Sequence, residues 1–411
     1  MATLINKRKI FNDPVYGFIT IPDDLVFDLI EHPFFQRLRR IKQLGLTHLV
    51  YPGALHTRFH HALGAFYLGR LAVETLRLKG HEITTEEEQG VSIALLLHDI
   101  GHGPFSHALE HSIVSGMTHE DLSLLFINKL NEEFDGKLSV AARIFTNTYP
   151  KRFLNQLVSG QLDMDRMDYL KRDSFYTGVS EGVISSDRIL NMLNIVGDDL
   201  VVEAKGIYSV EKFIVARRLM YWQVYLHKTV LAAEQMLVFL LRRAKELVMQ
   251  GVLIFTTPDL LAFLQHEYSL SDFEENREIL ERFARLDDYD IYTCMKIWMN
   301  AEDKVLSYLS KAIVNRHLFK VEIQTRPFSP VYIREIENEV AERDIVLNIN
   351  EIPYVVYHGE ITNNAYNPRK DKISILNKDG SVSDVTEASA QLNISILSET
   401  ITNYYLCYPK K

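Results

Sequence analysis

The spacing of hydrophobic positions follows the period of an α-helix for most of the chain. Between about residues 23 and 301, apolar side chains recur every three or four residues, as on the buried face of an amphipathic helix. The clearest stretches are 23–45, 60–80, 85–102, 119–130, 151–160, 210–250 and 274–301. This pattern predicts a mainly α fold with a multi-helix domain over residues 1–315.

Two parts of the chain depart from the helical period. Near the N-terminus, an Asn-Asp-Pro turn and the alternating run VYGFITI predict a short β-hairpin or extended arm over 11–21. After about residue 315, β-branched segments alternate at a period of two, and they lie at 319–325, 343–352, 354–361, 372–377 and 393–398. We therefore expect a small C-terminal α+β region over residues 316–411.

Composition and charge restrict the class of protein. A chain of 411 residues with 47% hydrophobic content buries a sizeable core, and a net charge of −9 argues against broad electrostatic binding of nucleic acid. Only Cys294 and Cys407 are present, which provides no disulfide framework and fits a reducing cytoplasm. The longest strongly apolar runs, such as 236–241, are too short to cross a bilayer. We expect a soluble, cytoplasmic protein with no membrane partner.

A cluster of histidines is the strongest chemical signal. His98, His102, His107 and His111 lie in the run LLLHDIGHGPFSHALEH, and Asp99 follows the first of them. The His98-Asp99 pair closes the apolar run VSIALLL, where glycine and proline end the predicted helix. Because a helix end in a buried core positions ligands accurately, the cluster predicts a bound metal ion.

Two further residues complete a candidate ligand set. His61 lies at a predicted helix start in HTRFHHALG, and Asp165 lies in the acidic run QLDMDRMDYL. With His98 and Asp99 they offer two imidazoles and two carboxylates, a set that suits Mn²⁺, Fe, Mg²⁺ or Zn²⁺. The lack of soft ligands disfavours a purely structural zinc site and predicts an open position for water or phosphate.

The order H…HD…D, with R-F-H-H before it and G-H-G-P-F-S-H after it, resembles the HD-domain metal-dependent phosphohydrolases. More narrowly, it is similar to the deoxynucleoside triphosphate triphosphohydrolases, including the vertebrate enzyme that joins a sterile alpha motif to an HD domain. The resemblance runs from about Lys9 to Leu231 and implies an HD domain within 1–315, with core motifs at about 50–170. It also implies a homo-oligomer, a nucleotide substrate, and the four metal ligands His61, His98, Asp99 and Asp165.

The resemblance also assigns catalytic positions, and these fall on His102, His107, Glu110, His119 and Glu120, with Glu110 in place of the vertebrate enzyme's Asp. Hydrolysis at the α-phosphorus needs a nucleophilic water, stabilisation of the equatorial oxygens and a proton for the departing 5′ oxygen. In this interpretation His107 is the general acid, oriented by Glu110, His119 or Glu120, while His102 helps to hold the phosphates.

Substrate contacts are implied at eight positions. The segment DMDRMDYLKRDSFYTG resembles the family block D-x-D-K-x-D-Y-x-x-R-D with Arg166 in place of Lys, and ARRLMYWQVYLHK and RRIKQLG match two further motifs. Tyr225, if it lies beneath C2′, would exclude a ribose hydroxyl. The hydrophobic pattern alone equally predicts that Leu44 and Tyr225 are core residues. The implied phosphate contacts are Arg58, Arg166 and Arg217, and the implied sugar contacts are Gln43, Leu44, Tyr169, Asp173 and Tyr225.

A nucleotide effector site is a further implication of the resemblance. Five residues fall on positions that bind an activating guanine nucleotide between subunits in the vertebrate enzyme: Lys9, Asn12, Glu31, Gln36 and Arg39. Glu31 stands where that enzyme has Asp, and downstream basic residues that would complete the site have no clear counterpart. A capped, charged helix start is the alternative interpretation.

Three functional hypotheses follow. The first is hydrolysis of a dNTP to a deoxynucleoside and inorganic triphosphate. The second is an HD phosphohydrolase that acts on another phosphate ester, such as a nucleoside monophosphate or a second messenger, although three arginines favour a long polyphosphate. The third is a nucleic-acid-binding protein with a non-catalytic metal site, against which the acidic charge weighs.

Overall fold

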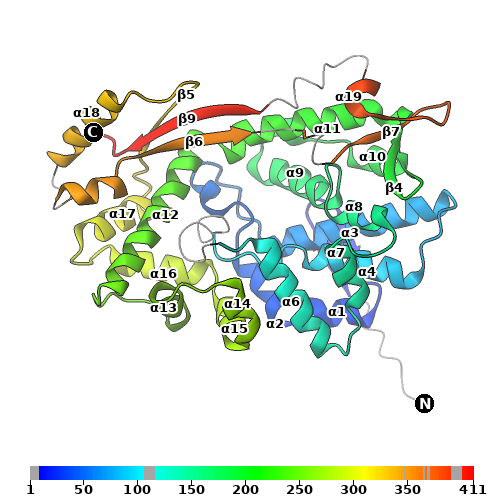
Figure 1. The fold of residues 1–411 in the computed structure, drawn as a ribbon, viewed down its shortest axis with the longest axis horizontal. Coiled ribbons are helices and arrows are strands. Elements are labelled where there is room, and N and C mark those ends of the chain that lie inside the picture. Colours follow the sequence, from blue (N-terminus) through cyan, green and yellow to red (C-terminus); the bar gives the residue numbers. More distant parts are fainter. Residues whose placement is uncertain are drawn as a thin grey trace.

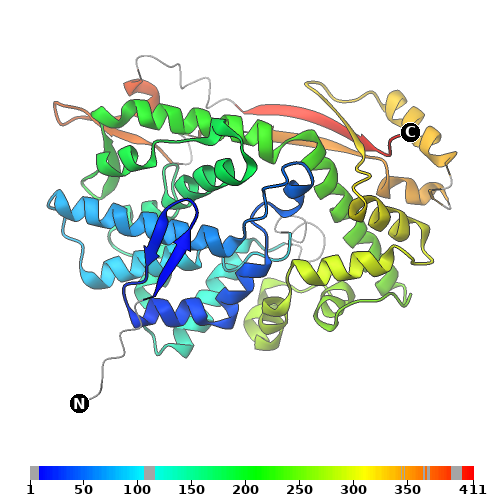
Figure 2. The same cartoon turned by 180° about the vertical axis from the view of Figure 1, so that it is seen from behind.

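The computed structural model describes residues 9–105, 116–343, 345–346, 348–363, 366–367, 371–389 and 400–411. Figures 1 and 2 show that the helices before about residue 220 pack in one half of the molecule and those between about residues 228 and 341 in the other. The earlier helices and helical turns are α1 (Asp24–Glu31), α2 (Pro33–Gln36), η1 (Arg37–Arg40), η2 (Gly45–Leu49), α3 (Arg58–Leu78), α4 (Thr85–Leu97), α6 (His119–Glu133), α7 (Ser139–Phe145), α8 (Arg152–Val158), α9 (Met164–Thr177), η3 (Ser180–Gly182), α10 (Ser186–Met192), η4 (Ala204–Gly206) and α11 (Ile207–Met220). The expected mainly α fold is confirmed.

The later helices continue from a π-helical turn. They are η5 (Tyr221–Tyr225), α12 (Lys228–Met249), α13 (Pro258–Gln265), α14 (Leu270–Glu275), α15 (Arg277–Arg285), α16 (Asp288–Trp298), α17 (Lys304–Val314), α18 (Pro330–Ala341), η6 (Ile349–Tyr354) and α19 (Val385–Ala388).

Helix α3 is the centre of the earlier half. It packs against α4 on one side and α9 on another, and most of its side chains are buried. Helix α4 begins with a capping box in which Thr84 and Glu87 satisfy each other's backbone N–H groups, and it is apolar along most of its last three turns. Because these helices are buried, the residues at their ends are held by the hydrophobic core.

Two of the predicted helical stretches are divided in the structure. The 23–45 stretch breaks at His32, because Pro33 forces the preceding residue out of helical geometry. The 210–250 stretch divides after η5, where the segments Ala204–Tyr225 and Lys228–Met249 meet at 59°.

The sheets are small and belong to three groups. The predicted N-terminal hairpin is confirmed as antiparallel β1 (Ile10–Asp13) and β2 (Gly17–Thr20). A second sheet has the order β3-β4-β7-β8, and a third has the order β5-β9-β6. Their strands are β3 (Leu193–Val196), β4 (Asp199–Glu203), β5 (Lys320–Gln324), β6 (Tyr357–Asn363), β7 (Ser374–Leu376), β8 (Val382–Asp384) and β9 (Ile401–Tyr408).

The C-terminal region contacts both halves. Strand β5 packs on α12, whereas β7 pairs in parallel with β4 and α19 packs on α11 (Figure 1). The strands predicted at 319–325, 354–361 and 372–377 are confirmed with shifted ends. The strand predicted at 343–352 is wrong for the described residues of that segment, which enter the turn η6 after Asn348 caps its start. The segment 393–398 lies outside the described residues.

Membrane-spanning potential is limited to one bent pair of helices. In the described ranges no single helix has both the length and the apolar character to cross a bilayer, and only the segments Ala204–Tyr225 and Lys228–Met249 taken together pass on length and composition. Many side chains of α12 are buried in the protein core.

Candidate metal centre and substrate cavity

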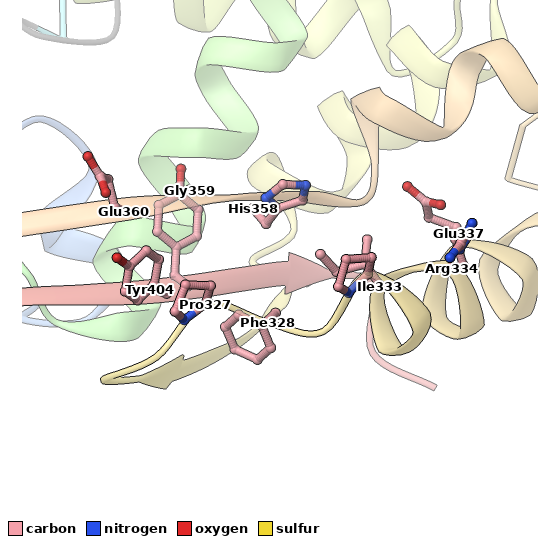
Figure 3. Close-up of a pocket in the computed structure, with 11 residues that line it drawn as sticks. Pro327, Phe328, Ile333, Arg334, Glu337, His358, Gly359, Glu360 and Tyr404 are labelled. Atoms are coloured by element: carbon pink, nitrogen blue, oxygen red, sulfur yellow. The ribbon is translucent and has the colours of Figure 1, made fainter.

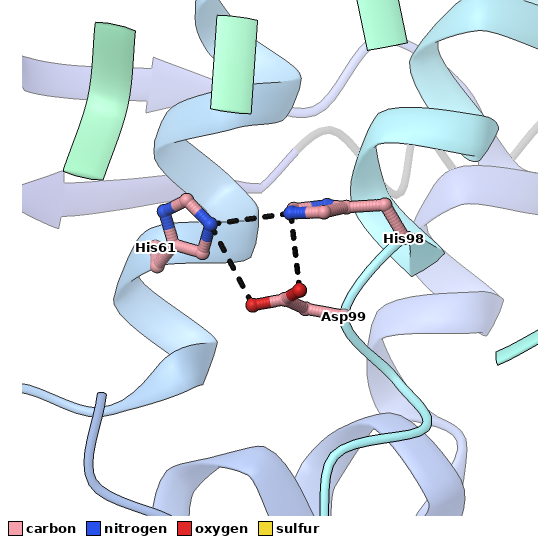
Figure 4. A group of neighbouring side chains, drawn as sticks. All are labelled: His61, His98 and Asp99. Carbon is pink, nitrogen blue, oxygen red and sulfur yellow. Dashed lines mark hydrogen bonds and ion pairs between the residues drawn. The ribbon is translucent and has the colours of Figure 1, made fainter. Parts of the chain in front are cut away.

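His61, His98 and Asp99 meet where α3 and the end of α4 approach each other (Figure 4). The two Nε2 atoms of the histidines lie 3.2 Å apart. Oδ1 of Asp99 lies 3.4 Å from Nε2 of His98, and Oδ2 of Asp99 lies 3.7 Å from Nε2 of His61. All three residues are buried, so their positions are fixed by the surrounding helices.

Asp165 adds the fourth predicted ligand from the first turn of α9. Its Oδ1 atom lies 3.1 Å from Nε2 of His61 and 3.6 Å from Nε2 of His98. Asp163 caps this helix by accepting a hydrogen bond from the backbone N–H of Arg166 at 2.7 Å. His61, His98 and Asp99 therefore form one close group, and Asp165 approaches the two imidazoles of that group from more than sixty residues further along the chain.

The hydrogen bonds of both histidines suit metal coordination. Nδ1 of His98 donates to the backbone carbonyl of Leu95 at 2.7 Å, and Nδ1 of His61 lies 2.8 Å from a carboxylate oxygen of Asp168. With Nδ1–H held in this way, each ring directs Nε2 toward the centre, which is the arrangement of metal-ligating histidines. Two such nitrogens and two carboxylates fit a divalent cation of the Mn²⁺, Fe, Mg²⁺ or Zn²⁺ type.

A buried ion-pair network supports His61 from behind. Arg172 donates two hydrogen bonds of 2.9 Å to the carboxylate of Asp168 and a third of 2.7 Å to Asp13. Gly64 on α3 makes room for this pair, because an added Cβ would lie 1.9 Å from Oδ1 of Asp168 and 2.3 Å from Nη2 of Arg172. The glycine thus permits the contact that fixes the His61 ring.

Protons and a cation compete for the same nitrogen atoms. Burial acts to lower the pKa of His61, but hydrogen bonds with Asp165 and Asp168 outweigh it and raise this pKa to about 10. Burial acts to raise the pKa of Asp165, yet its contacts with the two imidazoles hold that pKa far below its ordinary range. Cation binding would therefore release a proton from these histidines.

Two predicted catalytic histidines also lie near Asp99. Nε2 of His102 is 3.3 Å from Oδ1 of Asp99, and the ring of His102 stacks on that of His119 with centroids 3.9 Å apart. Burial, aided by the nearby guanidinium of Arg58, holds the pKa of His102 well below its ordinary value, so its imidazole is neutral at physiological pH. Asp99, His102 and His119 also form a second group with metal-ligand spacing.

The remaining predicted catalytic residues are only partly placed. Glu120 lies exposed in the first turn of α6, next to His119. His107 and Glu110, with the neighbouring His111, lie outside the described residues. Their assignment as general acid and orienting residue remains a prediction.

A cavity of about 420 Å³ opens beside the ligands. Its wall includes Asp165 and all eight residues predicted to contact substrate: Gln43, Leu44, Arg58, Arg166, Tyr169, Asp173, Arg217 and Tyr225. The structure thus brings together the predicted phosphate contacts and the predicted sugar contacts next to the predicted metal ligands. Phe105, Tyr221 and Glu234 also line the cavity and were not identified from the sequence.

The π-helical turn η5 explains how two tyrosines face this cavity. Its wider winding presents Tyr221 and Tyr225 together, with ring centroids 5.2 Å apart. The hydroxyl of Tyr225 donates to Asp173 at 2.7 Å, and Nε2 of His56 lies 2.7 Å from the other oxygen of that carboxylate. Burial and the Asp173 charge raise the pKa of Tyr225 well above its ordinary value, so the hydroxyl keeps its proton.

The predicted effector residues lie on the surface around the hairpin and α1. Nζ of Lys9 is 3.8 Å from a carboxylate oxygen of Glu31, and Nε of Arg39 donates to Gln36 at 2.9 Å. Asn12 is exposed on β1, opposite Phe18. This placement leaves the effector site a prediction.

A larger cavity of about 610 Å³ lies far from these ligands, between α18 and the β5-β9-β6 sheet (Figure 3). It is lined by proline and aromatic side chains such as Phe328 and Tyr404, together with charged groups such as Arg334 and Glu360. None of the predicted site residues lines it, so the smaller cavity is the candidate active site.

Several supporting residues escaped sequence reasoning. Asp168 and Arg172 stand four positions apart, which is the spacing of an ion pair along a helix, and this signal was available. His56 and Asp13 gave no such signal, because each contacts the site residues only through the tertiary fold.

The fold and this constellation define an HD-domain phosphohydrolase that resembles the deoxynucleoside triphosphate triphosphohydrolases. A family model of the HD domain matches residues 58–173, and one of the HD associated region matches residues 184–272. The chain is 34% identical to the uncharacterized protein YwfO of Bacillus subtilis, over 99% of this chain and 93% of that one. It belongs to this HD-domain family.

Solved structures and more distant relatives agree with this assignment. A crystal structure of a phosphohydrolase from Bacteroides thetaiotaomicron matches with a TM-score of 0.95 and 53% identity, over 98% of this chain and 100% of that one. The deoxynucleoside triphosphate triphosphohydrolase SAMHD1 of Gallus gallus is 36% identical over 42% of this chain and 34% of its own length. The similarity to SAMHD1 therefore covers about a third of that enzyme.

Proposed function

We propose that the protein hydrolyses deoxynucleoside triphosphates to a deoxynucleoside and inorganic triphosphate. The observation that carries this proposal is a single cavity lined by a metal ligand, Asp165, by three arginines and by the tyrosines of the predicted sugar site. Its volume of about 420 Å³ lies in the range of small-molecule sites. Similarity to the deoxynucleoside triphosphate triphosphohydrolase SAMHD1 supports the choice of substrate class.

Positive charge in the cavity suits a long polyphosphate. Arg58, Arg166 and Arg217 all line it, and guanidinium groups bind phosphate oxygens through paired hydrogen bonds. Arg58 is paired with Asp99 and Arg166 with Asp163, whereas Arg217 donates to the neutral side chain of Gln161. A polyphosphate would bind the guanidinium groups beside these carboxylates. A divalent cation held by the four ligands would polarise the reacting phosphoryl group and lower the pKa of the attacking water.

Proton transfer belongs to the imidazoles near Asp99. Neutral His102 would donate a hydrogen bond to a phosphate oxygen without adding charge, and His119 stacks against it. The departing 5′ oxygen needs a proton, and we assign this role to His107, oriented by Glu110 or Glu120.

The sugar end of the cavity is suited to reject ribose. Tyr225 is held by its hydrogen bond to Asp173, so its ring has one orientation, and Leu44 lies in the same wall. A ring fixed beneath C2′ leaves no space for a hydroxyl group. Gln43 and Tyr169 complete the contacts proposed for the sugar.

Several finer properties belong to the same proposal. The native metal is one of Mn²⁺, Fe, Mg²⁺ or Zn²⁺, the enzyme is a cytoplasmic homo-oligomer, and Lys9, Asn12, Glu31, Gln36 and Arg39 bind a guanine nucleotide effector. Lys9 and Glu31 lie near each other on the surface, which supports a nucleotide site of mixed charge there.

Product analysis tests the function. Purified protein is incubated with each dNTP and either Mn²⁺ or Mg²⁺, with and without GTP, and the deoxynucleoside and inorganic triphosphate are separated by chromatography. We expect equimolar release of both products. Release of monophosphate or pyrophosphate, or no product from metal-loaded protein, would refute dNTP triphosphohydrolysis and favour another phosphate ester.

A further inference from the structure

The turn between α8 and α9 contacts both arginines on one side of the cavity. Gln161 in this turn is 7% exposed and Arg217 is 9% exposed, and Nη1 of Arg217 donates to Oε1 of Gln161 at 3.2 Å. The carbonyl of Gly160, one residue earlier, accepts a hydrogen bond from Nη1 of Arg166. A short turn thus holds two guanidinium groups that reach the cavity from different helices.

The C-terminal region holds the same turn from outside. The backbone N–H of Gln161 donates to Oδ2 of Asp371 at 3.3 Å. Asp371 precedes β7, which pairs in parallel with β4 and is thereby fixed to the helical body. An added Cβ on Gly160 would lie 3.3 Å from the same Asp371 oxygen and 3.0 Å from the carbonyl of Gln156, so the glycine allows this close approach.

We propose that Gln161 is a positioning residue for the phosphate-binding arginine Arg217, and that Asp371 extends this support to the C-terminal region. This inference rests on the proposed function in assigning Arg217 to the substrate's phosphates. Arg217 is a long side chain with several rotatable bonds, so a buried acceptor that holds one orientation lowers the entropy lost when phosphate binds. The glutamine acts through the arginine and touches no reacting atom.

Inorganic tripolyphosphate, titrated into the Mn²⁺-loaded full-length protein, measures this role apart from turnover. The variant Gln161→Leu keeps the side-chain volume but removes the acceptor. We expect it to bind tripolyphosphate about tenfold more weakly, since hydrogen bonds to charged groups contribute on this scale. With dNTP as substrate, KM should rise by a similar factor while kcat stays within about threefold.

A double-mutant cycle separates positioning from a general structural effect. In an Arg217→Ala background, Gln161→Leu should cause no further loss of affinity, because the group that it orients is gone. Equal losses in both backgrounds, or wild-type affinity in Gln161→Leu, would overturn the proposal. Arg217→Ala alone should bind at least as weakly as Gln161→Leu.

Gln156 provides a matched control. It lies on α8, where its side-chain Oε1 accepts from the backbone N–H of Leu200 on β4 at 2.7 Å, and among the described residues no hydrogen bond joins its side chain to either arginine. Gln156→Leu should therefore leave tripolyphosphate affinity unchanged. If it weakens binding as much as Gln161→Leu does, loosening of the whole contact accounts for the effect and positioning is rejected.

The contribution of the C-terminal region has its own variant. Asp371→Ala removes the acceptor of the Gln161 backbone N–H and should weaken tripolyphosphate binding about threefold. Wild-type affinity in Asp371→Ala would reject this link and leave the Gln161 role intact. If the protein binds tripolyphosphate but leaves every dNTP intact, only the proposed function is refuted. If the protein hydrolyses dNTPs and Gln161→Leu does not change this hydrolysis, only the positioning role is refuted.

Discussion

Gly64 is the residue whose substitution tests the metal site most directly. In Gly64→Ala the new Cβ would lie 1.9 Å from Oδ1 of Asp168 and 2.3 Å from Nη2 of Arg172, and neither side chain can retreat. Arg172 is held at its other end by Asp13, and Asp168 is held by His61. We therefore expect the substitution to break the ion pair and release the His61 ring.

The magnitude follows from opposing effects. Breaking a buried ion pair costs about 3–5 kcal/mol. Alanine is favoured over glycine in a helix interior by about 1 kcal/mol. The free energy of unfolding of the metal-free protein should therefore fall by about 2–4 kcal/mol. Loss of the hydrogen bond that orients His61, a predicted metal ligand, should also weaken metal affinity by about 10–100-fold.

Urea denaturation of the metal-free protein measures the first effect, and chelator competition measures the second. Gly90→Ala is a matched control, because its Cβ would meet only apolar atoms, with Val140 Cγ1 at 2.6 Å. It should lose stability through crowding but bind metal like the wild type. Wild-type stability and metal affinity in Gly64→Ala would refute the proposed role of the Asp168–Arg172 pair.

Three further outcomes are expected. Asp165→Ala should lose both bound metal and turnover. His107→Ala should lose turnover but keep its metal, as measured by elemental analysis. Full activity of His107→Ala would show that His107 is not the general acid. Tyr225→Ala should raise kcat/KM for ribonucleotides relative to deoxynucleotides about tenfold, and Tyr225→Phe, which keeps the ring, should leave that ratio near wild type. Burial acts to raise the pKa of Glu87, but contacts with Lys151 and the helix N-terminus hold it below its ordinary value of 4.5. The ionised form therefore stabilises the fold above that pH and this contribution is lost as pH falls further. Between about pH 5 and pH 3, the free energy of unfolding of the wild-type protein should fall further than that of Glu87→Gln, as measured by urea titration. Equal falls in the two proteins would contradict the lowered pKa of Glu87.

Much of the fold and of the candidate site could be predicted because the signals are local. Helical periodicity identified most of the helices, and the His98-Asp99 pair followed directly from the end of an apolar run. Two short strands at 193–203 were missed although Gly197 marks the turn between them with a φ of 65°. Each strand has only four or five residues, so its period of two could not be distinguished from the helical pattern on either side.

Other features depend on contacts between distant segments and left no readable pattern. Strand β9 was not predicted, because its residues pair with β5 and β6 from far upstream. The π-helical turn at Tyr221 is a backbone adjustment within an otherwise continuous helical period. The approach of Asp371 to Gln161 joins residues 210 positions apart, and only the folded chain brings them together.

The parallel pairing of β4 with β7 has a consequence for how the enzyme is made. Val201 lies opposite Ser374, so this sheet can close only after the ribosome has added more than 170 residues beyond β4. Contacts of such long sequence separation form slowly, because the entropy of closing the loop is lost before the contact is gained. The helical body can assemble earlier, but the turn that carries Gln161 acquires its outer support last. Newly made protein should therefore contain folded helices before it acquires full activity, and the final step of its maturation is the docking of its C-terminal strands.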